Sequence, residues 1–302
     1  MNKSIFCVDI GGSKLICGAL SPNGEIIESI RFEYPKNYNL ETIVEYIKQG
    51  HDSLRHYDMA VCGAAIPGLC DNKNGKWLYS PFSGIENIPI SDIIHDICGL
   101  EVFCDNDVNI SALAEKYYGA CKNTDDYLWI TVSNGIGGGL FLDGKLYRGK
   151  HLTAGEIGHV IVEKNSHRKC GCGNFGCLEA MASGASISQI YNEITGKNLS
   201  AKDICDIARS GDPVAKKVWH DAGFYIGKAS AHAVNLLGFE NIILGGGAAE
   251  GFSLLEDGLY EGYDKFVFKR ANPSKNIFVH SAVGKYAALK GCAALCLYEK
   301  GE

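Results

Sequence analysis

The chain has 302 residues, enough for one large domain or two medium ones and for a core that needs no disulfide. Hydrophobic residues make up 46% and charged residues 21%, which excludes a disordered, collagenous or coiled-coil protein. The 29 basic and 35 acidic residues give a net charge of −6, whereas a general binder of nucleic acid or of anionic membranes is normally basic. We therefore expect no nucleic-acid partner and no membrane partner.

The opening residues, MNKSIFCVDIGGSK, do not have the pattern of a signal peptide. Lys3 is the one basic residue before the apolar stretch, and Asp9 interrupts that stretch after four residues. Thirteen cysteines in a long chain without a signal peptide predict free thiols or metal ligands rather than disulfides. These features together predict a cytoplasmic protein.

The first part of the chain alternates apolar strands with amphipathic helices. Strands are expected over residues 4–10, 15–20, 25–34, 59–66 and 101–104. A helix is expected over about 40–56, because Ile43, Ile47 and Leu54 share one helical face. A second helix is expected to begin near Asn109, which would cap it.

The second part of the chain repeats the opening pattern. A strand over 127–133 reaches a glycine-rich turn at 134–139 and doubles back, as the first strand does at Gly11 and Gly12. This echo predicts an internal duplication. After a cysteine-rich loop at 165–177 we expect helices to about 237, strands at 240–244 and 277–280, and a terminal helix over 285–299. The pattern favours two α/β lobes with a cleft between them.

Three glycine clusters follow predicted strands, at Asp9–Lys14, Asn134–Gly139 and Gly245–Gly247. Glycine lets backbone N–H groups approach a phosphate closely, and Asp9 would hold Mg²⁺ against the phosphate oxygens. Neither late cluster completes a dinucleotide-binding fingerprint, and the sequence contains no P-loop. The alternative interpretation is three tight turns in a glycine-rich fold.

Two carboxylates, Asp105 and Asp107, lie where a predicted strand runs into a helix. A turn at this point separates them, so we expect one to face a site and Asp105 to be structural. A carboxylate here can accept a hydroxyl proton during phosphoryl transfer. The alternative is an ordinary helix N-terminus, where Asp and Asn are favoured caps.

The pattern His159-x10-Cys170-x-Cys172-x4-Cys177 predicts a closed, structural zinc site with three thiolates and one imidazole. Zinc would order the loop that leads from His159 to Cys177. Glu156 and Glu179 flank this loop and would hydrogen-bond the vicinal hydroxyls of a polyol. The alternative is that both are surface acids.

Five segments, in this order along the chain, resemble the ROK family of bacterial sugar kinases and sugar-responsive repressors. They are DIGGSK (9–14), DNDVN (105–109), NGIGGG (134–139), AGEIGH (154–159) and CGCGNFGCLEA (170–180). The resemblance implies an actin-like ATPase, or hexokinase-like, α/β fold with two RNase-H-like lobes and an interlobe cleft. We expect an N-terminal lobe over 1–116, with 287–302 packing back on it, and a C-terminal lobe over 117–286 that carries the zinc loop.

The resemblance also implies roles for individual residues. Asp107 would be the catalytic base that deprotonates the 6-hydroxyl of the sugar. The other sugar-binding positions would be Gly68, Asn106, Glu156, His159 and Glu179, with His159 binding zinc and sugar through different ring nitrogens. ATP and Mg²⁺ would bind at Asp9, Gly11, Gly12, Ser13, Lys14, Asn134, Gly135, Gly137, Gly245, Gly246 and Gly247, with the adenosine near the last three.

The sequence departs from the family pattern at three places. Ser13 replaces the commoner Thr, Ser133-Asn134 replaces Gly-Thr, and Pro81–Ile85 replaces the glucokinase-type segment.

The predicted function is an ATP-dependent kinase that phosphorylates the 6-hydroxyl of a hexose. Glucose is the first candidate, and N-acetylmannosamine, N-acetylglucosamine and fructose are the alternative substrates. A non-catalytic sugar sensor is the alternative of another class. Eight residues before Asp9 and the net charge of −6 argue against a repressor. Family members are usually homodimers or tetramers, and we expect a homodimer.

Overall fold

The computed structural model describes residues 3–80, 84–269 and 276–301. Contacts divide the chain into two units. Unit 1 contains the described residues up to Asn123, the segment Arg148–Thr153 and the residues from Tyr286 onward, and unit 2 contains Thr124–Tyr147 and Ala154–Lys285. Pro81–Ser83, where the sequence departs from the glucokinase pattern, lie outside the described residues.

Unit 1 is built on a five-stranded sheet in the order β3-β2-β1-β4-β8. Its strands are β1 (Ser4–Ile10), β2 (Lys14–Leu20), β3 (Ile26–Glu33), β4 (Met59–Ile66) and β8 (Val102–Asn106). The first three form an antiparallel meander, and β4 and β8 add in parallel to β1. A smaller sheet joins β5 (Leu69–Asp71), β6 (Lys76–Tyr79) and β7 (Glu86–Ile88).

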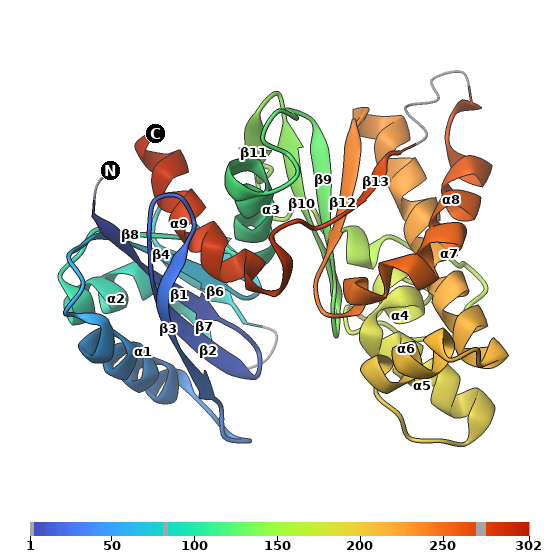
Figure 1. Ribbon diagram of the computed structural model, residues 1–302, viewed down its shortest axis with the longest axis horizontal. Helices are drawn as coiled ribbons and strands as arrows, with labels where there is room; N and C mark the ends of the chain where they lie inside the picture. Colours follow the sequence, from blue (N-terminus) through green and yellow to red (C-terminus); the bar gives the residue numbers. More distant parts are fainter. Residues whose placement is uncertain (1–2, 81–83, 270–275, 302) are drawn as a thin grey trace. The chain divides into compact units, whose positions relative to one another are not determined.

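Helices cover both faces of the large sheet in unit 1, because its parallel strands are apolar on both sides. The helices are α1 (Leu40–Leu54), α2 (Ile90–Cys98), α3 (Asp107–Tyr118) and α9 (Ala287–Lys300). Helices α1 and α2 share one core with the side chains of Cys62 and Ala64. Gly63, between them on β4, faces the other side, where a Cβ would lie 2.2 Å from the carbonyl oxygen of Cys292 on α9. Figure 1 shows α9 running along this sheet.

Unit 2 repeats the strand order and polarity of unit 1. Its sheet runs β11-β10-β9-β12-β13, with β11 (Lys145–Tyr147), β10 (Ile136–Leu142), β9 (Tyr127–Val132), β12 (Asn241–Gly245) and β13 (Phe278–His280). The first three strands are again antiparallel, and the last two again add in parallel. The repeated strand pattern in the sequence therefore corresponds to a repeated sheet.

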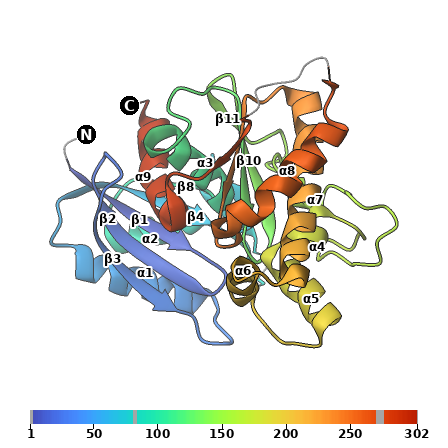
Figure 2. The ribbon, with the colours of Figure 1, turned by 45° about the vertical axis from the view of Figure 1, so that its right-hand side comes forward.

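Helices form most of unit 2 between the cysteine-rich loop and β12, as the sequence predicts. They are α4 (Leu178–Ala182), α5 (Gly184–Thr195), α6 (Ala201–Arg209) and α7 (Pro213–Leu237), and α8 (Phe252–Phe266) follows β12. Single 3₁₀ turns lie at Ile157–His159, Ala248–Gly251 and Gly284–Tyr286. Figure 2 shows α7 and α8 side by side. Glycines let their backbones touch, since a Cβ on Gly227 would lie 2.0 Å from the carbonyl oxygen of Leu259.

Two local predictions were wrong. Helix α3 begins at Asp107 and is capped by Asn106, not by Asn109, because the Asn106 side chain accepts hydrogen bonds from the backbone N–H groups of Val108 and Asn109 at 2.9 and 3.2 Å. The glycines from Gly137 to Gly139 lie within strand β10 rather than in a turn. One of them, Gly138, lies against a backbone segment that leaves no room for a side chain, as described below.

No helix in the described part of the chain is long and apolar enough to cross a membrane.

The contact between α7 and α8 gives a test of the core of unit 2. Gly227→Ala should lower the free energy of unfolding by about 1–3 kcal/mol, because the new methyl group forces two packed backbones apart. Lys216→Ala, at an exposed position of the same helix, is the control and should change stability by less than about 0.5 kcal/mol. Urea unfolding measures both, and equal stabilities would contradict the close helix packing.

Candidate functional site

In unit 1, three predicted site segments lie at one edge of the sheet. Strands β1, β4 and β8 are parallel, with Asp9 paired to Ala65 and Ile66 paired to Asn106. Their carboxyl ends therefore bring Asp9, Gly68 and the Asn106-Asp107 pair to the same edge. The open edge at the carboxyl ends of parallel strands is where α/β proteins bind ligands.

Asn106 fixes the local geometry around Asp107. Its amide Nδ2 donates to the carbonyl oxygen of Gly68 at 2.8 Å and to Asp107 Oδ1 at 3.1 Å. The Val108 N–H also donates to Asp107 Oδ1, at 3.0 Å. Asp107 is half-buried and lies in the first turn of α3, where the partial positive charge of the helix favours a carboxylate. These donors and its position in α3 therefore fix the carboxyl group of Asp107 as a hydrogen-bond acceptor.

Asp105 has a different environment, although it lies two residues from Asp107. It is 1% exposed and accepts from Arg148 Nε at 2.5 Å, from Asn109 Nδ2 at 3.0 Å and from the N–H of Asn106 at 2.7 Å. Arg148 also pairs with Glu299 at 3.0 Å. A buried carboxylate that is paired and hydrogen-bonded in this way positions the strand end rather than reacting. The expectation that Asp105 is structural agrees with these contacts.

The turn between β1 and β2 contains Asp9 at its start, followed by Gly11, Gly12, Ser13 and Lys14. It is closed by a hydrogen bond from the Gly11 N–H to the carbonyl oxygen of Lys14, at 2.9 Å. Burial raises the pKa of Asp9 to about 6, and the positive charge of Lys14 offsets part of this rise. A carboxylate whose charge is this poorly compensated fits a site that accepts a cation.

In unit 2, the two later glycine clusters also meet at one sheet edge. Strands β9 and β12 are parallel, with Thr131 paired to Gly245, so Asn134 and Gly135 lie near Gly246 and Gly247. Ser133 joins the two ends, since its Oγ accepts from the Gly247 N–H at 3.2 Å. Gly246 has φ +91°, and a Cβ there would lie 2.7 Å from the carbonyl oxygen of Val132. The clusters predicted for the nucleotide are therefore brought together.

The segment 154–159 lies directly against strand β10. A Cβ on Gly155 would lie 2.0 Å from the carbonyl oxygen of Gly138, and a Cβ on Gly158 would lie 2.0 Å from that of Ile136. A Cβ on Gly138 would in turn lie 2.7 Å from the carbonyl oxygen of Gly155, so glycine is required on both sides of that contact, which explains Gly138 within the strand. The contact fixes Glu156 and His159 relative to β10.

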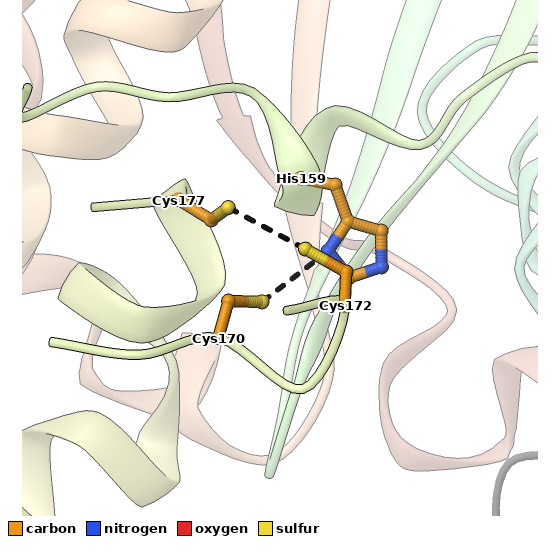
Figure 3. Close-up of side chains that lie close together, drawn as sticks. All are labelled: His159, Cys170, Cys172 and Cys177. Carbon is orange, nitrogen blue, oxygen red and sulfur yellow. Dashed lines mark hydrogen bonds between the residues drawn. The ribbon is translucent and has the colours of Figure 1, made fainter. Parts of the chain in front are cut away.

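The predicted metal ligands His159, Cys170, Cys172 and Cys177 come together, with their ligand atoms within 4.8 Å of one another (Figure 3). The Cys170 Sγ lies 3.5 Å from His159 Nδ1, and the Cys172 Sγ lies 3.7 Å from the Cys177 Sγ. Tetrahedral zinc with Zn–S of about 2.3 Å and Zn–N of about 2.0 Å needs sulfur–sulfur edges of about 3.8 Å and sulfur–nitrogen edges of about 3.5 Å. The donor set and its spacing therefore fit zinc.

The two predicted sugar-binding acids both approach this cluster. Glu156 Oε2 lies 3.7 Å from His159 Nε2, the ring nitrogen that does not face the thiols. Glu179 Oε1 lies 3.7 Å from the Cys170 Sγ, and Oε2 accepts from the backbone N–H of Ile136 at 3.0 Å. Glu179 therefore links the cysteine-rich loop to the turn that contains Asn134 and Gly135.

Sequence reasoning missed two residues that organise these sites. Arg148, which neutralises Asp105, is 43 positions away from it, and no local pattern connects the two. Ser133 was noted only as a departure from the family motif, yet its backbone oxygen and hydroxyl hold the Gly184 and Gly247 N–H groups. A polar side chain directly after an apolar strand was the one available signal for Ser133.

The comparisons with known proteins agree with the motifs. A model of the ROK family matches residues 5–299. The chain is 31% identical to the glucokinase of Thermotoga maritima, over 82% of this chain and 83% of that protein. It is 32% identical to the DNA-binding transcriptional dual regulator NagC of Escherichia coli, over 72% of this chain but 55% of the regulator.

Among solved structures, a ROK family glucokinase from Streptomyces griseus in complex with glucose and AMPPNP is 28% identical, with a TM-score of 0.85 over 97% of this chain and 98% of that one. The fold is the actin-like, hexokinase-like α/β fold that the sequence predicts. The chain belongs to the ROK family.

The cysteine cluster gives a prediction about metal content. Protein saturated with zinc and then desalted should retain one zinc ion per chain, measured by mass spectrometry of the element, because four preset ligands close the coordination sphere. Cys177→Ser should lose the metal, and Cys205→Ser, which removes a buried thiol of α6, should keep it. A wild-type chain that stays metal-free would contradict the assignment of the cluster.

The raised pKa of Asp9 gives a prediction about stability and pH. The folded pKa of about 6 lies above the ordinary aspartate pKa of about 3.9, so the folded state loses stability as the pH rises through this range. Without added magnesium or nucleotide, Asp9→Asn should be more stable than wild type at pH 7 by on the order of 1–3 kcal/mol. The difference should vanish as the pH falls to about 4.

Urea unfolding across this pH range measures the effect of Asp9, and Asp52→Asn, which removes an exposed acid of α1, is the control. A constant difference between Asp9→Asn and wild type at all pH values would contradict the raised pKa.

Proposed function

We propose that this protein is an ATP-dependent sugar kinase that transfers the γ-phosphoryl group to the 6-hydroxyl of a hexose. The observation that carries the proposal is the placement of Asp107 at the start of α3, where Asn106 is anchored to Gly68. A hydrogen-bonded carboxylate at the carboxyl edge of parallel strands suits proton abstraction from a bound alcohol. The similarity to glucokinases of the same family supports the same reaction.

Asp107 would act as the general base. It takes the proton of the sugar 6-hydroxyl while that oxygen attacks the γ-phosphorus of ATP, and ADP leaves. Asp105 is unsuited to this role, because Arg148 and Asn109 already occupy its oxygens. This contrast supports Asp107 as the base and Asp105 as a residue that positions the end of β8.

The hydroxyl groups of the sugar would be held by polar side chains and backbone groups. We infer contacts from Asn106 and the backbone at Gly68, and from Glu156, His159 and Glu179. His159 is suited to a double role, because Nδ1 faces the thiols and Nε2 is the nitrogen near Glu156. A metal on Nδ1 would fix the proton on Nε2, which then donates to a sugar hydroxyl.

The nucleotide would bind at the glycine turns. We infer contacts from Gly11, Gly12, Ser13 and Lys14, from Asn134, Gly135 and Gly137, and from Gly245, Gly246 and Gly247 around the adenosine. Asp9 would hold Mg²⁺, which neutralises charge on the phosphates when it is bound. Zinc at the cysteine cluster would have a structural role, since its four protein ligands leave no open position.

Glucose is the first candidate substrate. The similar kinases named above are glucokinases, and one of them was solved with glucose. Leu69, next to Gly68, offers no polar side chain for an acetamido group, which favours a plain hexose over an N-acetylhexosamine. N-acetylmannosamine, N-acetylglucosamine and fructose are the alternatives, and the homodimer stays a prediction.

The substrate is tested with an ADP-coupled assay over glucose, mannose, fructose, allose, glucosamine, N-acetylglucosamine and N-acetylmannosamine. The highest kcat/KM should fall on glucose. Turnover of an N-acetylhexosamine alone would support the proposed kinase activity but contradict glucose as the substrate.

The role of Asp107 gives the sharpest prediction for the mechanism. Asp107→Ala and Asp107→Asn should each lower kcat by about 10²–10⁴-fold, because proton abstraction in the transition state is lost. Asp107→Asn should bind the sugar within a few-fold of wild type in calorimetry, since the amide keeps the shape and a hydrogen-bonding oxygen.

Asp96→Asn, at an exposed position of α2, is the matched control and should keep wild-type turnover. An active Asp107→Ala protein would refute the mechanism. A wild-type protein that binds sugar but transfers no phosphate would identify a sugar sensor instead.

A further inference from the structure

Tyr38 connects the turn between β1 and β2 to another part of unit 1. It lies directly before Asn39, the cap residue of α1, and 26 positions after Gly12 in the sequence. Its hydroxyl group donates a hydrogen bond to the backbone carbonyl oxygen of Gly12, at 3.0 Å. Gly12 belongs to the turn that we infer to bind phosphate, whereas the roles proposed so far do not include Tyr38.

The hydrogen bond from Tyr38 fixes the direction of one peptide unit in this turn. The peptide unit between Gly12 and Ser13 is trans and planar, so its carbonyl oxygen and its N–H point in opposite directions. Because the Gly12 carbonyl oxygen is held toward Tyr38, the Ser13 N–H points away from it. Among the described residues, no backbone or side-chain atom accepts a hydrogen bond from the Ser13 N–H. This N–H is therefore available to a phosphate oxygen.

The next two carbonyl groups along the turn are held by backbone donors. The N–H of Tyr34, the first residue after β3, donates to the carbonyl oxygen of Ser13 at 2.9 Å. The N–H of Gly11 donates to the carbonyl oxygen of Lys14, also at 2.9 Å. Tyr38 thus supplies the side-chain hydrogen bond among the three, and a substitution can remove this bond without changing the backbone.

An aromatic stack holds the ring of Tyr38. It stacks on the ring of Tyr34, with centroids 4.0 Å apart and planes inclined by 11°. Tyr34 also stacks on Tyr46 of α1, with centroids 5.9 Å apart. Tyr46 in turn stacks on Phe32 of β3, at 4.9 Å, and all four rings pack against the hydrophobic core of unit 1. Because packing restricts the ring, the hydroxyl group of Tyr38 is kept in place for its bond to Gly12.

We propose that Tyr38 is a positioning residue for phosphate binding and acts through the peptide unit between Gly12 and Ser13. This inference rests on the proposed function, because it takes the turn at Asp9–Lys14 as part of the nucleotide site. Gly12 has no Cβ to restrict its backbone, so the peptide unit rotates readily once the Tyr38 hydroxyl is removed. A rotated unit turns the Ser13 N–H away from the phosphate, and the loss of preorganisation weakens binding.

Calorimetry of the full zinc-loaded chain with Mg-AMPPNP and with adenosine tests the proposal. Tyr38→Phe keeps the stacked ring and removes the hydroxyl group. It should weaken AMPPNP binding by about 3–10-fold, the effect of one hydrogen bond. Adenosine carries no phosphate, so its affinity should be the same as for wild type. In the ADP-coupled assay, the KM for ATP should rise by the same factor while the KM for the sugar is unchanged.

Tyr46→Phe is the matched control. It removes a hydroxyl group of the same stack, which donates to the carbonyl oxygen of Glu33 at 3.4 Å rather than to the turn. Its affinity for AMPPNP should equal that of wild type. Thermal unfolding of both variants checks that each one is folded.

Four results would decide the matter. Equal AMPPNP affinities for wild type and Tyr38→Phe would overturn the inference and leave the proposed function standing. The same loss with adenosine, or in Tyr46→Phe, would also overturn it, because the effect would then not depend on phosphate or on the bond to Gly12. Weaker AMPPNP binding by Tyr38→Phe, with a wild type that transfers no phosphate, would support the inference and contradict the kinase. A wild type that binds no AMPPNP would contradict both.

Discussion

The backbone contact between the segment 155–158 and strand β10 determines the arrangement of the proposed site in unit 2. Gly155 and Gly158 touch the carbonyl groups of Gly138 and Ile136 so closely that no side chain fits at either glycine. Because His159 follows Gly158 directly, the imidazole that faces the cysteines is held against the same strand. Glu179 closes the arrangement from the other side, by accepting from the Ile136 N–H. A zinc ion at the cysteines would therefore stabilise the acids inferred to bind sugar and the turn inferred to bind phosphate.

In unit 1, two carboxylates that are close in the sequence have different environments. The side chains of Asp105 and Asp107 both belong to the junction of β8 and α3. Arg148 and Asn109 bind the first, whereas the second lies beside the amide of Asn106 and the helix N-terminus. The buried ion pair positions the strand end, and leaving Asp105 unpaired would be strongly unfavourable. The carboxylate that we propose as the base thus depends on a buried neighbour whose oxygens are held by Arg148 and Asn109.

The elements that the sequence predicted well are those set by local pattern. Apolar runs gave β1 and β4 at their observed bounds, because strands with two buried faces are continuously apolar. The predicted metal ligands lie together as their spacing predicts, since a short glycine-rich loop joins the three cysteines; they are His159, Cys170, Cys172 and Cys177. The repeated strand-turn-strand pattern predicted the repeated sheet for the same reason.

The errors arose where contacts between distant residues decide the structure. Four residues in this segment have side chains that can cap a helix: Asp105, Asn106, Asp107 and Asn109. Strand β8 pairs with β4 as far as Asn106, so the helix begins directly after it and Asn106 is the cap. A glycine run resembles a turn until the segment that packs against it is known, as at Gly138. Arg148 carries no local sign of its partner Asp105. In each case the deciding contact lies outside the window that a local pattern covers.

The most direct test of the proposed function is ³¹P NMR of the reaction of zinc-loaded protein with Mg-ATP and glucose, with 6-deoxyglucose as the matched control sugar. A 6-hydroxyl kinase should give one phosphate monoester on the sugar 6-oxygen for each ADP formed, and no transfer to 6-deoxyglucose. Release of inorganic phosphate alone, or the same phosphorylated product yield with the 6-deoxy sugar, would contradict a 6-hydroxyl kinase.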